Sequence, residues 1–151
     1  MTLVVLWIHV VGAVVWIGGT LYQAHALVPA ARRGGDARPF VAAARRARPA
    51  TWTAIALVVL TGFYNVTRLG PIERVMESGA GLALAGKFFL VILAVALASQ
   101  RDFNQLARLS RALDAGADPR PALTAIAWLD RIVLVFGLSV IYLGLMVSRS
   151  A

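Results

Sequence analysis

Three ionisable side chains lie inside long apolar stretches of this sequence, and they are the residues most able to do chemistry. They are His9, His25 and Lys87. Ionisable groups at membrane depth are rare and costly, so each is a candidate functional residue. An imidazole nitrogen can bind a metal ion, and an ammonium group can hold an anion such as a carboxylate. The sequence therefore indicates a metal or cofactor site within a membrane.

His9 stands about six residues into the first apolar stretch, roughly 9 Å deep at a rise of 1.5 Å per residue. Trp16 and Gln23 follow at intervals of seven, so the three residues share one face of a helix. Small residues flank this face, and they allow another helix or a flat ligand to approach the backbone. These are Gly12, Ala13, Gly19 and Thr20. Two interpretations stay open: a hydrogen-bonded histidine in a packing seam, or a histidine that ligates a metal ion.

Lys87 stands about six residues into the third apolar stretch, at the same predicted depth as His9. A lysine at this depth can snorkel to the membrane interface, or it can pair with a bound carboxylate. Four further residues fall near the same end: Tyr64, Asn65, Tyr142 and Met146. We expect these six residues to line one pocket that opens to the outer side, with the Met146 sulfur as an additional metal ligand.

The two histidines of one chain are not expected to share a metal ion. His25 is sixteen residues beyond His9, which places it about 160° around the helix and about 24 Å along it. An interfacial role is one interpretation of His25. A second metal or proton site, shared with a partner chain in a homodimer, is the other.

The elements that position these residues are four helices long enough to span a bilayer. Of the 151 residues 60% are hydrophobic and only 15% are charged, and the charges cluster between apolar runs. This pattern predicts an all-α integral membrane four-helix bundle in contact with the lipid bilayer, with residues 1–151 as a single domain. The expected helices are Thr2–Val28, Pro49–Thr67 (beginning at Pro49 or Ala50), Gly81–Gln100 and Pro121–Val147. We find no internal repeat.

Two polar segments join these helices on the arginine-rich side. In the first, Asp36 is expected to cap a short helical turn that begins near Pro39. Beyond Gln100, apolar residues recur every three to four positions, which predicts that the third helix extends out of the membrane as an amphipathic helix. These residues are Phe103, Leu106, Leu109 and Leu113. Gly116 and Pro119 are expected to end the extension.

Basic residues predict the orientation. The segment between the first two helices carries six arginines and that between the last two carries four, whereas residues 68–81 carry two basic and two acidic residues. The positive-inside rule then predicts an N-out/C-out, multi-pass protein of the inner (cytoplasmic) membrane. It also accounts for the net charge of +8, so no nucleic acid is expected as a partner. At the inner end of the last helix, Asp130 is expected to pair with Arg48 or Arg101.

Three stretches carry a family resemblance: IHVVGAVVWIGGTLY from Ile8, TGFYN from Thr61 and GKFFLVILAVALASQRDFN from Gly86. They resemble the membrane domain of copper-resistance protein D (CopD-like proteins) and, more distantly, the HemJ-type protoporphyrinogen oxidases. The first resemblance implies copper binding or copper passage across the inner membrane. The second implies a b-type heme, with His9 and Lys87 as the transferable positions. The chain differs from the HemJ type in lacking its further histidine in the third helix and its Asn-Glu-x-Pro stretch in the fourth.

Heme b is the favoured cofactor at this stage. One deep histidine, His9, suffices for an axial bond to iron, and the glycines Gly12 and Gly19 make room for a flat macrocycle. Trp16 offers an aromatic wall, and Lys87 offers charge to a propionate. A second axial ligand would come from Met146, Tyr64, Lys87 or a second subunit. The function would be electron transfer with a redox partner, or catalysis as a heme-dependent oxidoreductase.

Copper is the alternative. Cu(I) prefers thiolate, thioether and imidazole ligands, but the chain has no cysteine and only three methionines, Met1, Met76 and Met146. These three and His9 fall on the predicted outer side, which permits an outer access site for copper. A structural or assembly subunit without a metal is a third class. Hydrolytic catalysis is disfavoured, because no serine triad and no carboxylate pair lie at membrane depth.

Overall fold

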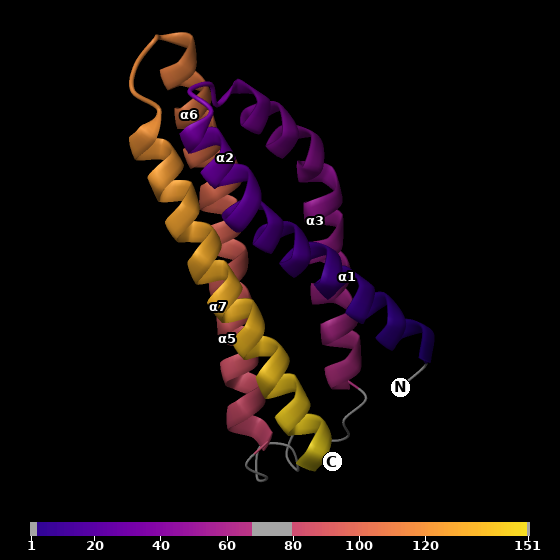
Figure 1. Cartoon of the computed structure of the whole chain (residues 1–151). Coiled ribbons are helices and arrows are strands. Elements are labelled where there is room, and N and C mark those ends of the chain that lie inside the picture. Colours follow the sequence, from indigo (N-terminus) through magenta and orange to yellow (C-terminus); the bar gives the residue numbers. More distant parts are fainter. Residues whose placement is uncertain (1–2, 68–79, 151) are drawn as a thin grey trace.

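The computed structural model describes residues 3–67 and 80–150, and this part of the chain forms four helical rods (Figure 1). The first rod joins α1 (Leu3–Tyr22), the π-helical segment η1 (Gln23–Leu27) and α2 (Val28–Arg33). The second rod is α3 (Arg38–Thr67). The third joins α5 (Ala80–Ser99), the π-helical segment η2 (Gln100–Gln105) and α6 (Leu106–Asp114), and the fourth is α7 (Arg120–Ser150).

All four rods are long and apolar enough to cross a membrane. They confirm the predicted all-α, four-helix membrane architecture. Large apolar side chains cover the outside of the bundle, and on α1 alone Leu3, Trp7 and Val14 are each at least 65% exposed. Such a surface is what a bilayer requires and what water penalises. The predicted loop at residues 68–79 lies outside the described residues, as do Met1 and Met76.

The second helix begins much earlier than expected. We predicted a start at Pro49 or Ala50, but α3 begins at Arg38 and contains Pro49 in its interior. The segment before Pro49 is rich in alanine and arginine, which are good helix formers, and Phe40 and Val41 are buried there. This local stability outweighs the hydrogen bond that the proline removes, and α3 bends along its length (Figure 1).

The first helix also passes its predicted end, because η1 and α2 continue the rod through Pro29 to Arg33. The predicted amphipathic extension of the third helix is confirmed as α6. Its Leu106 and Leu109 are buried, and the turn after it contains Gly116 at a φ of 65°. A positive φ is accessible to glycine at little cost, which explains why the helix ends there.

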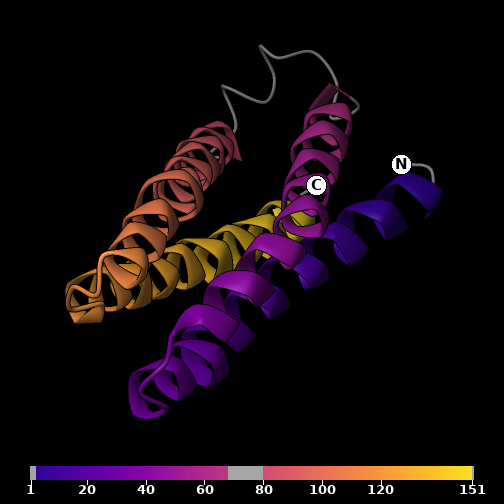
Figure 2. The same ribbon diagram turned by 90° about the horizontal axis from the view of Figure 1, so that it is seen from above.

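The four rods form two hairpins, because α1 packs against α3 and α5 packs against α7 (Figure 2). We call the end where α1 begins and α7 ends the terminal end, and the end formed by α2 and α6 the arginine-rich end. In both hairpins the first rod runs from the terminal end to the arginine-rich end, and the second rod returns (Figure 1). The hairpins diverge toward the terminal end.

The turns of the two hairpins repeat one sequence pattern, Asp-x-Arg-Pro, at residues 36–39 and 118–121. In each turn the aspartate Oδ1 accepts a hydrogen bond from the backbone N–H two residues later, at 2.9 Å for Asp36 and 3.0 Å for Asp118. A glycine with positive φ precedes each aspartate, Gly35 by one residue and Gly116 by two. The two hairpin turns are therefore alike, although we find no longer repeat in the sequence.

The two hairpins also share the order of their elements. In each first rod a π-helical segment, which begins at Gln23 or Gln100, interrupts the α-helix. The returning helices α3 and α7 begin at Arg38 and Arg120, so equivalent positions differ by 82. The bundle is thus built from two similar hairpins whose corresponding helices run in the same direction (Figure 1).

Two apolar clusters hold the hairpins together. The middle cluster contains Trp16, Ala54, Ile55, Val58, Ala94, Ala98 and Val133. The second cluster lies toward the arginine-rich end and contains Val28, Ala37, Phe40, Val41, Leu106, Leu109, Leu123, Ile126 and Ala127. Between them lie four buried polar residues, Arg101, Asp102, Gln105 and Asp130. The terminal half of the bundle has no comparable cluster among the described residues.

Candidate functional site

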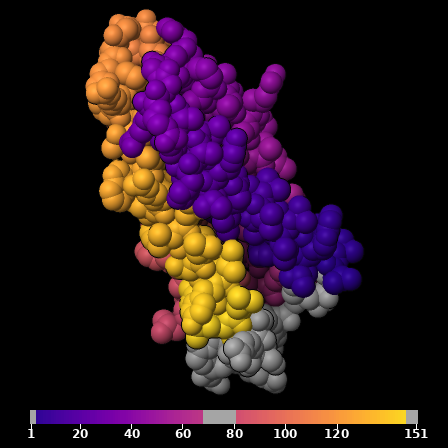
Figure 3. Space-filling view, in the orientation of Figure 1, coloured from indigo at the N-terminus to yellow at the C-terminus, as the bar shows by residue number. Residues whose placement is uncertain are grey.

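A cavity of about 820 Å³ lies between the two hairpins in the terminal half of the bundle. All four rods contribute to its wall, from Leu6–Gly18 on α1, Val58–Val66 on α3, Leu84–Ala94 on α5 and Gly137–Leu145 on α7. Figure 3 shows a notch in the surface where the terminal parts of α1 and α7 diverge. Most of the lining is apolar, and its polar residues are His9, Trp16, Asn65 and Lys87.

His9 is held in one tautomer by its neighbour on α3. Its Nδ1 lies 2.8 Å from Thr61 Oγ1, and the Thr61 hydroxyl donates its own hydrogen to the carbonyl oxygen of Leu57. A hydroxyl has one hydrogen, so this arrangement fits the tautomer in which Nδ1 donates to Thr61. Nε2 is then unprotonated and carries a lone pair, which is the form that ligates a metal ion.

Glycines make room for both ionisable side chains of the cavity. A Cβ atom at Gly62 would lie 3.4 Å from His9 Cε1, and one at Gly144 would lie 3.3 Å from Lys87 Nζ. Gly62 and Gly144 are equivalent positions of the two hairpins, 82 residues apart. Each hairpin therefore seats one ionisable side chain of its first helix against a glycine of its second. The predicted common depth of His9 and Lys87 follows from this repeat.

Several polar atoms of the cavity wall have no partner among the described residues. Trp16 is 4% exposed and its indole Nε1–H has no acceptor, and Asn65 Oδ1 is buried without a donor. No described group forms a hydrogen bond with Lys87 Nζ. Buried polar groups are normally satisfied, so these atoms are available to a ligand or to water.

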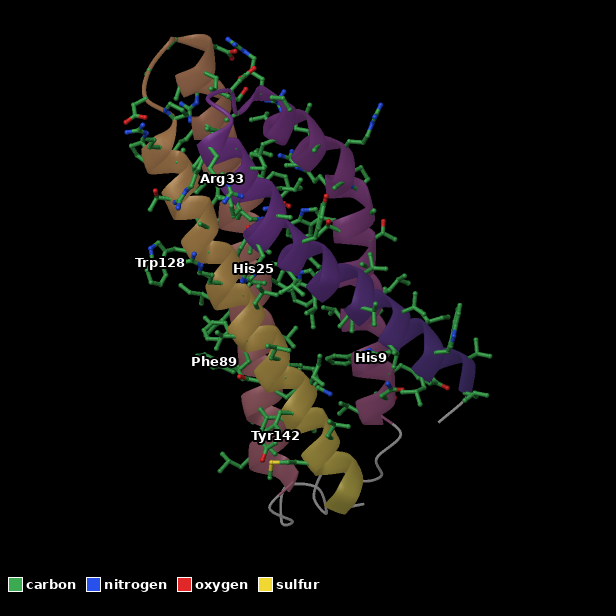
Figure 4. The ribbon with its side chains drawn as sticks, in the orientation of Figure 1. His9, His25, Arg33, Phe89, Trp128 and Tyr142 are labelled. Carbon is green, nitrogen blue, oxygen red and sulfur yellow. The ribbon has the colours of Figure 1, made fainter. Side chains whose placement is uncertain are left out.

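The structure brings together four of the residues that the sequence nominated, His9, Trp16, Asn65 and Lys87, and leaves others outside the cavity wall. Tyr142 is 64% exposed and Met146 is 48% exposed on the outside of α7. Tyr64 is also exposed on α3, next to the lining residue Asn65. In Figure 4, Tyr142 points away from the bundle, whereas His9 lies where α1 crosses α3. The rotation of each helix about its axis, set by packing, decides these positions.

The two glycines proposed to flank a ligand serve different purposes. Gly12 is buried against α3, where an added Cβ would lie 3.0 Å from Val58 Cγ2 and 3.2 Å from the Ala54 carbonyl oxygen. It permits close approach of two helices. An added Cβ at Gly19 would meet nothing within 4 Å, and neither glycine belongs to the cavity wall.

His25 lies outside the cavity and toward the arginine-rich end (Figure 4). It is exposed, and its Nδ1 lies 3.1 Å from the Leu21 carbonyl oxygen of its own helix. Among the described residues no three histidine, cysteine or acidic side chains gather in a way that would hold a metal ion. Within that part of the chain, His9 is the imidazole of the cavity.

An ion cluster lies behind the cavity floor, between the two apolar clusters. Arg101 donates from Nε to Asp102 Oδ1 at 2.7 Å and from Nη1 to Asp130 Oδ1 at 2.6 Å. The second oxygen of Asp102 accepts from Trp52 Nε1 at 3.0 Å, and that of Asp130 accepts from Gln23 Nε2 at 3.0 Å. Every carboxylate oxygen of the cluster therefore has a donor, as burial of charge requires.

The predicted pairing of Asp130 with Arg101 is confirmed, but its burial was not foreseen. Asp130 is fully buried and Arg101 is 4% exposed, so they are core residues rather than boundary charges. Asp102 was not singled out, nor were Thr61 and the glycine pair Gly62 and Gly144. The recurrence of Asp-x-Arg-Pro, 82 residues apart, was the available signal, since it sets the register in which the two glycines correspond.

The family model for copper resistance protein D matches residues 41–147, which extend from α3 to α7. The chain belongs to the copper resistance protein D family. The match to this family, CopD, includes Thr61, Lys87 and the arginine and aspartates of the ion cluster, whereas His9 lies before it. No curated protein and no solved structure matches the chain.

Proposed function

We propose that this CopD-family protein handles copper in the membrane, with the cavity as the access site for Cu(I) and His9 Nε2 as its imidazole ligand. Membership of the family supports copper as the substrate. The observation that carries the site is the hydrogen bond between His9 and Thr61, which leaves Nε2 unprotonated on a side chain of the cavity wall. Imidazole is a suitable ligand for copper.

The sparse donor set favours passage of copper over storage. A site that conducts an ion must bind it strongly enough to admit it and weakly enough to release it. One imidazole in an apolar cavity meets that condition, whereas a closed set of three or four ligands would retain the metal ion. The outward-facing orientation predicted from the arginines would make the cavity open to the outer side.

Lys87 sets the main electrostatic constraint on this proposal. Its ammonium group lies in the wall of the same cavity and repels a bare cation. The side chain is long enough to carry its charge toward the terminal interface, as lysines near helix ends do. We therefore expect the lysine to lower the affinity of the site for copper.

Copper accumulation in vesicles tests the proposal. The purified chain is reconstituted in lipid vesicles, Cu(I) is supplied outside, and the copper content of the vesicles is measured by elemental analysis. The proposal predicts accumulation above protein-free vesicles and a decrease of about tenfold in His9→Ala, because the cavity loses its imidazole. His25→Ala is the matched control, since His25 is exposed and outside the cavity. Equal accumulation in His9→Ala and the unchanged chain would refute the assignment of His9.

The size of the cavity favours a second candidate, a b-type heme. Pockets for organic ligands measure about 300–1,000 Å³, and the volume of about 820 Å³ falls in this range. An ion needs far less room. Trp16 Nε1 and Lys87 Nζ are donors suited to an oxygen-bearing ligand such as a propionate, and His9 Nε2 is suited to an axial bond. The described residues offer no second imidazole in the cavity.

An absorbance spectrum of the detergent-purified protein separates the two candidates. A Soret band that disappears in His9→Ala and persists in His25→Ala would establish the heme interpretation. A colourless protein that binds Cu(I) through His9 is the result expected for copper. Electron transfer, oxidoreductase activity and a redox partner follow only from the first result.

A further inference from the structure

The side-chain hydrogen bonds that join the two hairpins within the described structure all lie in its arginine-rich half. Three belong to the ion cluster, where donors of the first hairpin reach acceptors of the second: Gln23 to the Asp130 carboxylate, Trp52 to the Asp102 carboxylate and Arg48 to the Asp102 carbonyl. Three others are exposed and lie nearer the arginine-rich end, joining Arg32 to Thr124, Arg38 to the Leu113 carbonyl and Arg45 to Ser110.

The cavity half is different. Its one interhelical side-chain bond among the described residues, from His9 to Thr61, stays within the first hairpin. Among pairs of described residues, no bond of this kind crosses the cavity from one hairpin to the other. Side-chain hydrogen bonds thus join the two hairpins in the arginine-rich half, whereas α1 and α7 diverge toward the terminal end (Figure 1).

The ion cluster closes the space behind the cavity. Along α5 and η2, Ala94 lines the cavity, Ala98 is fully buried one turn later, and Asp102 of the cluster follows after one more turn. Trp16 of the cavity wall packs in the same apolar layer as Ala94 and Ala98. The order from the terminal end is therefore cavity, apolar layer and ion cluster.

Both ion pairs of the cluster lie within the second hairpin. Arg101 holds Asp102 beside it on η2 and Asp130 on α7. The carboxylates meet the first hairpin only through uncharged donors, the Gln23 amide and the Trp52 indole. Separation of the hairpins here would leave both ion pairs intact. It would break two hydrogen bonds from neutral groups and the bond from the Arg48 guanidinium to the Asp102 carbonyl.

We propose that this cluster is the inner gate of a passage whose outer part is the cavity, and that the two hairpins are its moving halves. Rocking of one repeat against the other is the general way in which transporters built from repeats open one side and close the other. The structure corresponds to the state that is open at the cavity and closed at the cluster. The π-helical segments support this role: both begin at the cluster, at Gln23 and Gln100, and such segments are frequent at functional sites.

The absence of cysteine from the chain allows a direct test. Ala98→Cys lies in the buried apolar layer between the cavity and the ion cluster, so it reports whether a reagent can pass the gate from the arginine-rich side. Ala13→Cys lies in the cavity wall and reports access to the cavity. A membrane-impermeant thiol reagent is applied to one side of oriented vesicles at a time. With no other change, we expect Ala13→Cys to be labelled from the terminal side and Ala98→Cys to be labelled from neither side.

The gate is then weakened by the double substitution Gln23→Leu and Trp52→Phe, which removes both uncharged donors and leaves the ion pairs in place. We expect Ala98→Cys to be labelled from the arginine-rich side at least about tenfold faster. The matched control is Arg45→Ala, which removes a bond between the hairpins that lies outside the cluster and should leave the labelling of Ala98→Cys unchanged.

Two results would overturn the gate. One is rapid labelling of Ala98→Cys from the arginine-rich side without the double substitution. The other is no acceleration by the double substitution while Ala13→Cys is still labelled, which shows that the fold persists. If labelling of Ala13→Cys is lost, the double variant has not kept the fold. The single substitution Gln23→Leu then takes its place, and the same two results test the gate.

For its cargo this inference rests on the copper function proposed above, but the labelling rates need no copper. Normal labelling together with no copper accumulation would count against copper alone. Copper accumulation together with an inert Ala98→Cys would count against the gate alone.

Discussion

The two halves of the bundle treat their polar residues in opposite ways. In the arginine-rich half, every carboxylate oxygen of Asp102 and Asp130 accepts a hydrogen bond, and Asp130 is fully buried. In the cavity half, Trp16 Nε1 and Asn65 Oδ1 are buried without a partner among the described residues, and beside the ion cluster Arg48 Nε is the one further such atom of a described residue. A satisfied network stabilises a fold, whereas unsatisfied groups around a space indicate where a ligand binds. We therefore infer that the arginine-rich half stabilises the fold and closes the bundle, and that the cavity half binds the ligand.

The repeat makes this contrast informative, because both hairpins use equivalent positions in both halves. Gly62 and Gly144 are equivalent, and each makes room for an ionisable residue of the cavity. Arg48 and Asp130 are also 82 residues apart, and both belong to the surroundings of the ion cluster. The two hairpins therefore provide a histidine and a lysine beside equivalent glycines in one half, and a donor and an acceptor at the ion cluster in the other.

The largest effect is expected from Asp130→Ala, which removes one partner of the buried network. Arg101 loses an ion pair and Gln23 loses its acceptor, at a site that is fully buried. Loss of one partner of a buried pair costs about 3–5 kcal/mol. Thermal or denaturant unfolding in detergent measures the change. Asp114→Ala, at an exposed aspartate on α6, is the control and should change stability by less than about 0.5 kcal/mol.

If Asp130→Ala and Asp114→Ala prove equally stable, the arginine-rich half does not stabilise the fold in the way that the comparison requires.

The second effect concerns the tautomer of His9. Thr61→Val keeps the shape of the side chain but removes the acceptor of His9 Nδ1. Mutation of a group that orients a metal-binding histidine lowers metal affinity by about 10–100-fold, and we expect a decrease of that size in Cu(I) affinity. Competition with a coloured Cu(I) chelator measures it. Thr51→Val, whose hydroxyl bonds to its own helix at Ala47, should leave the affinity as it was; an equal loss in both variants would show that Thr61 does not act through His9.

The third effect separates the two glycines of α1. Gly12→Ala would place a Cβ 3.0 Å from Val58 Cγ2 and should destabilise the protein by about 1–3 kcal/mol, because the α1–α3 contact is overpacked. Gly19→Ala meets nothing within 4 Å and should be neutral or slightly stabilising, since alanine is the better helix former. Unfolding of both variants under one condition is the measurement. The opposite order of stabilities would mean that the two helices do not approach at Gly12.

The smallest expected effect is a change in ligand affinity, and its direction distinguishes the two candidate ligands. Lys87→Met removes the ammonium and keeps the length of the side chain. For Cu(I), removal of a like charge should tighten binding about threefold to tenfold, or about 1 kcal/mol. For heme or another ligand with carboxylates, the same substitution should weaken binding. Titration of the purified variant with Cu(I), and separately with heme, measures whether the affinity for each ligand rises or falls.

Sequence reasoning worked best where long apolar runs decide the structure. Four spanning helices follow from length and composition, and the common depth of His9 and Lys87 follows from counting residues along two helices that start at the same end. Both residues line the cavity. The amphipathic pattern after Gln100 was strong enough to predict α6 as well.

Sequence reasoning failed where tertiary packing of the helices outweighs a local sequence signal. Pro49 was read as a helix start, but the buried Phe40 and Val41 extend α3 well before it. Tyr142 and Met146 were expected in the cavity, but the rotation of α7 about its axis turns them outward. Hydropathy alone does not fix such a rotation. The bond from His9 to Thr61 depends on the register between α1 and α3, which a single sequence does not reveal.

The central claim is that His9 is the copper ligand of the cavity. Its most direct test is the amount of Cu(I) that the detergent-purified protein binds in competition with a coloured chelator. We predict about one bound Cu(I) per chain in the unchanged protein and in His25→Ala, and none in His9→Ala. Retention of the bound Cu(I) by His9→Ala would contradict the claim, and so would a protein that binds no Cu(I) in any form.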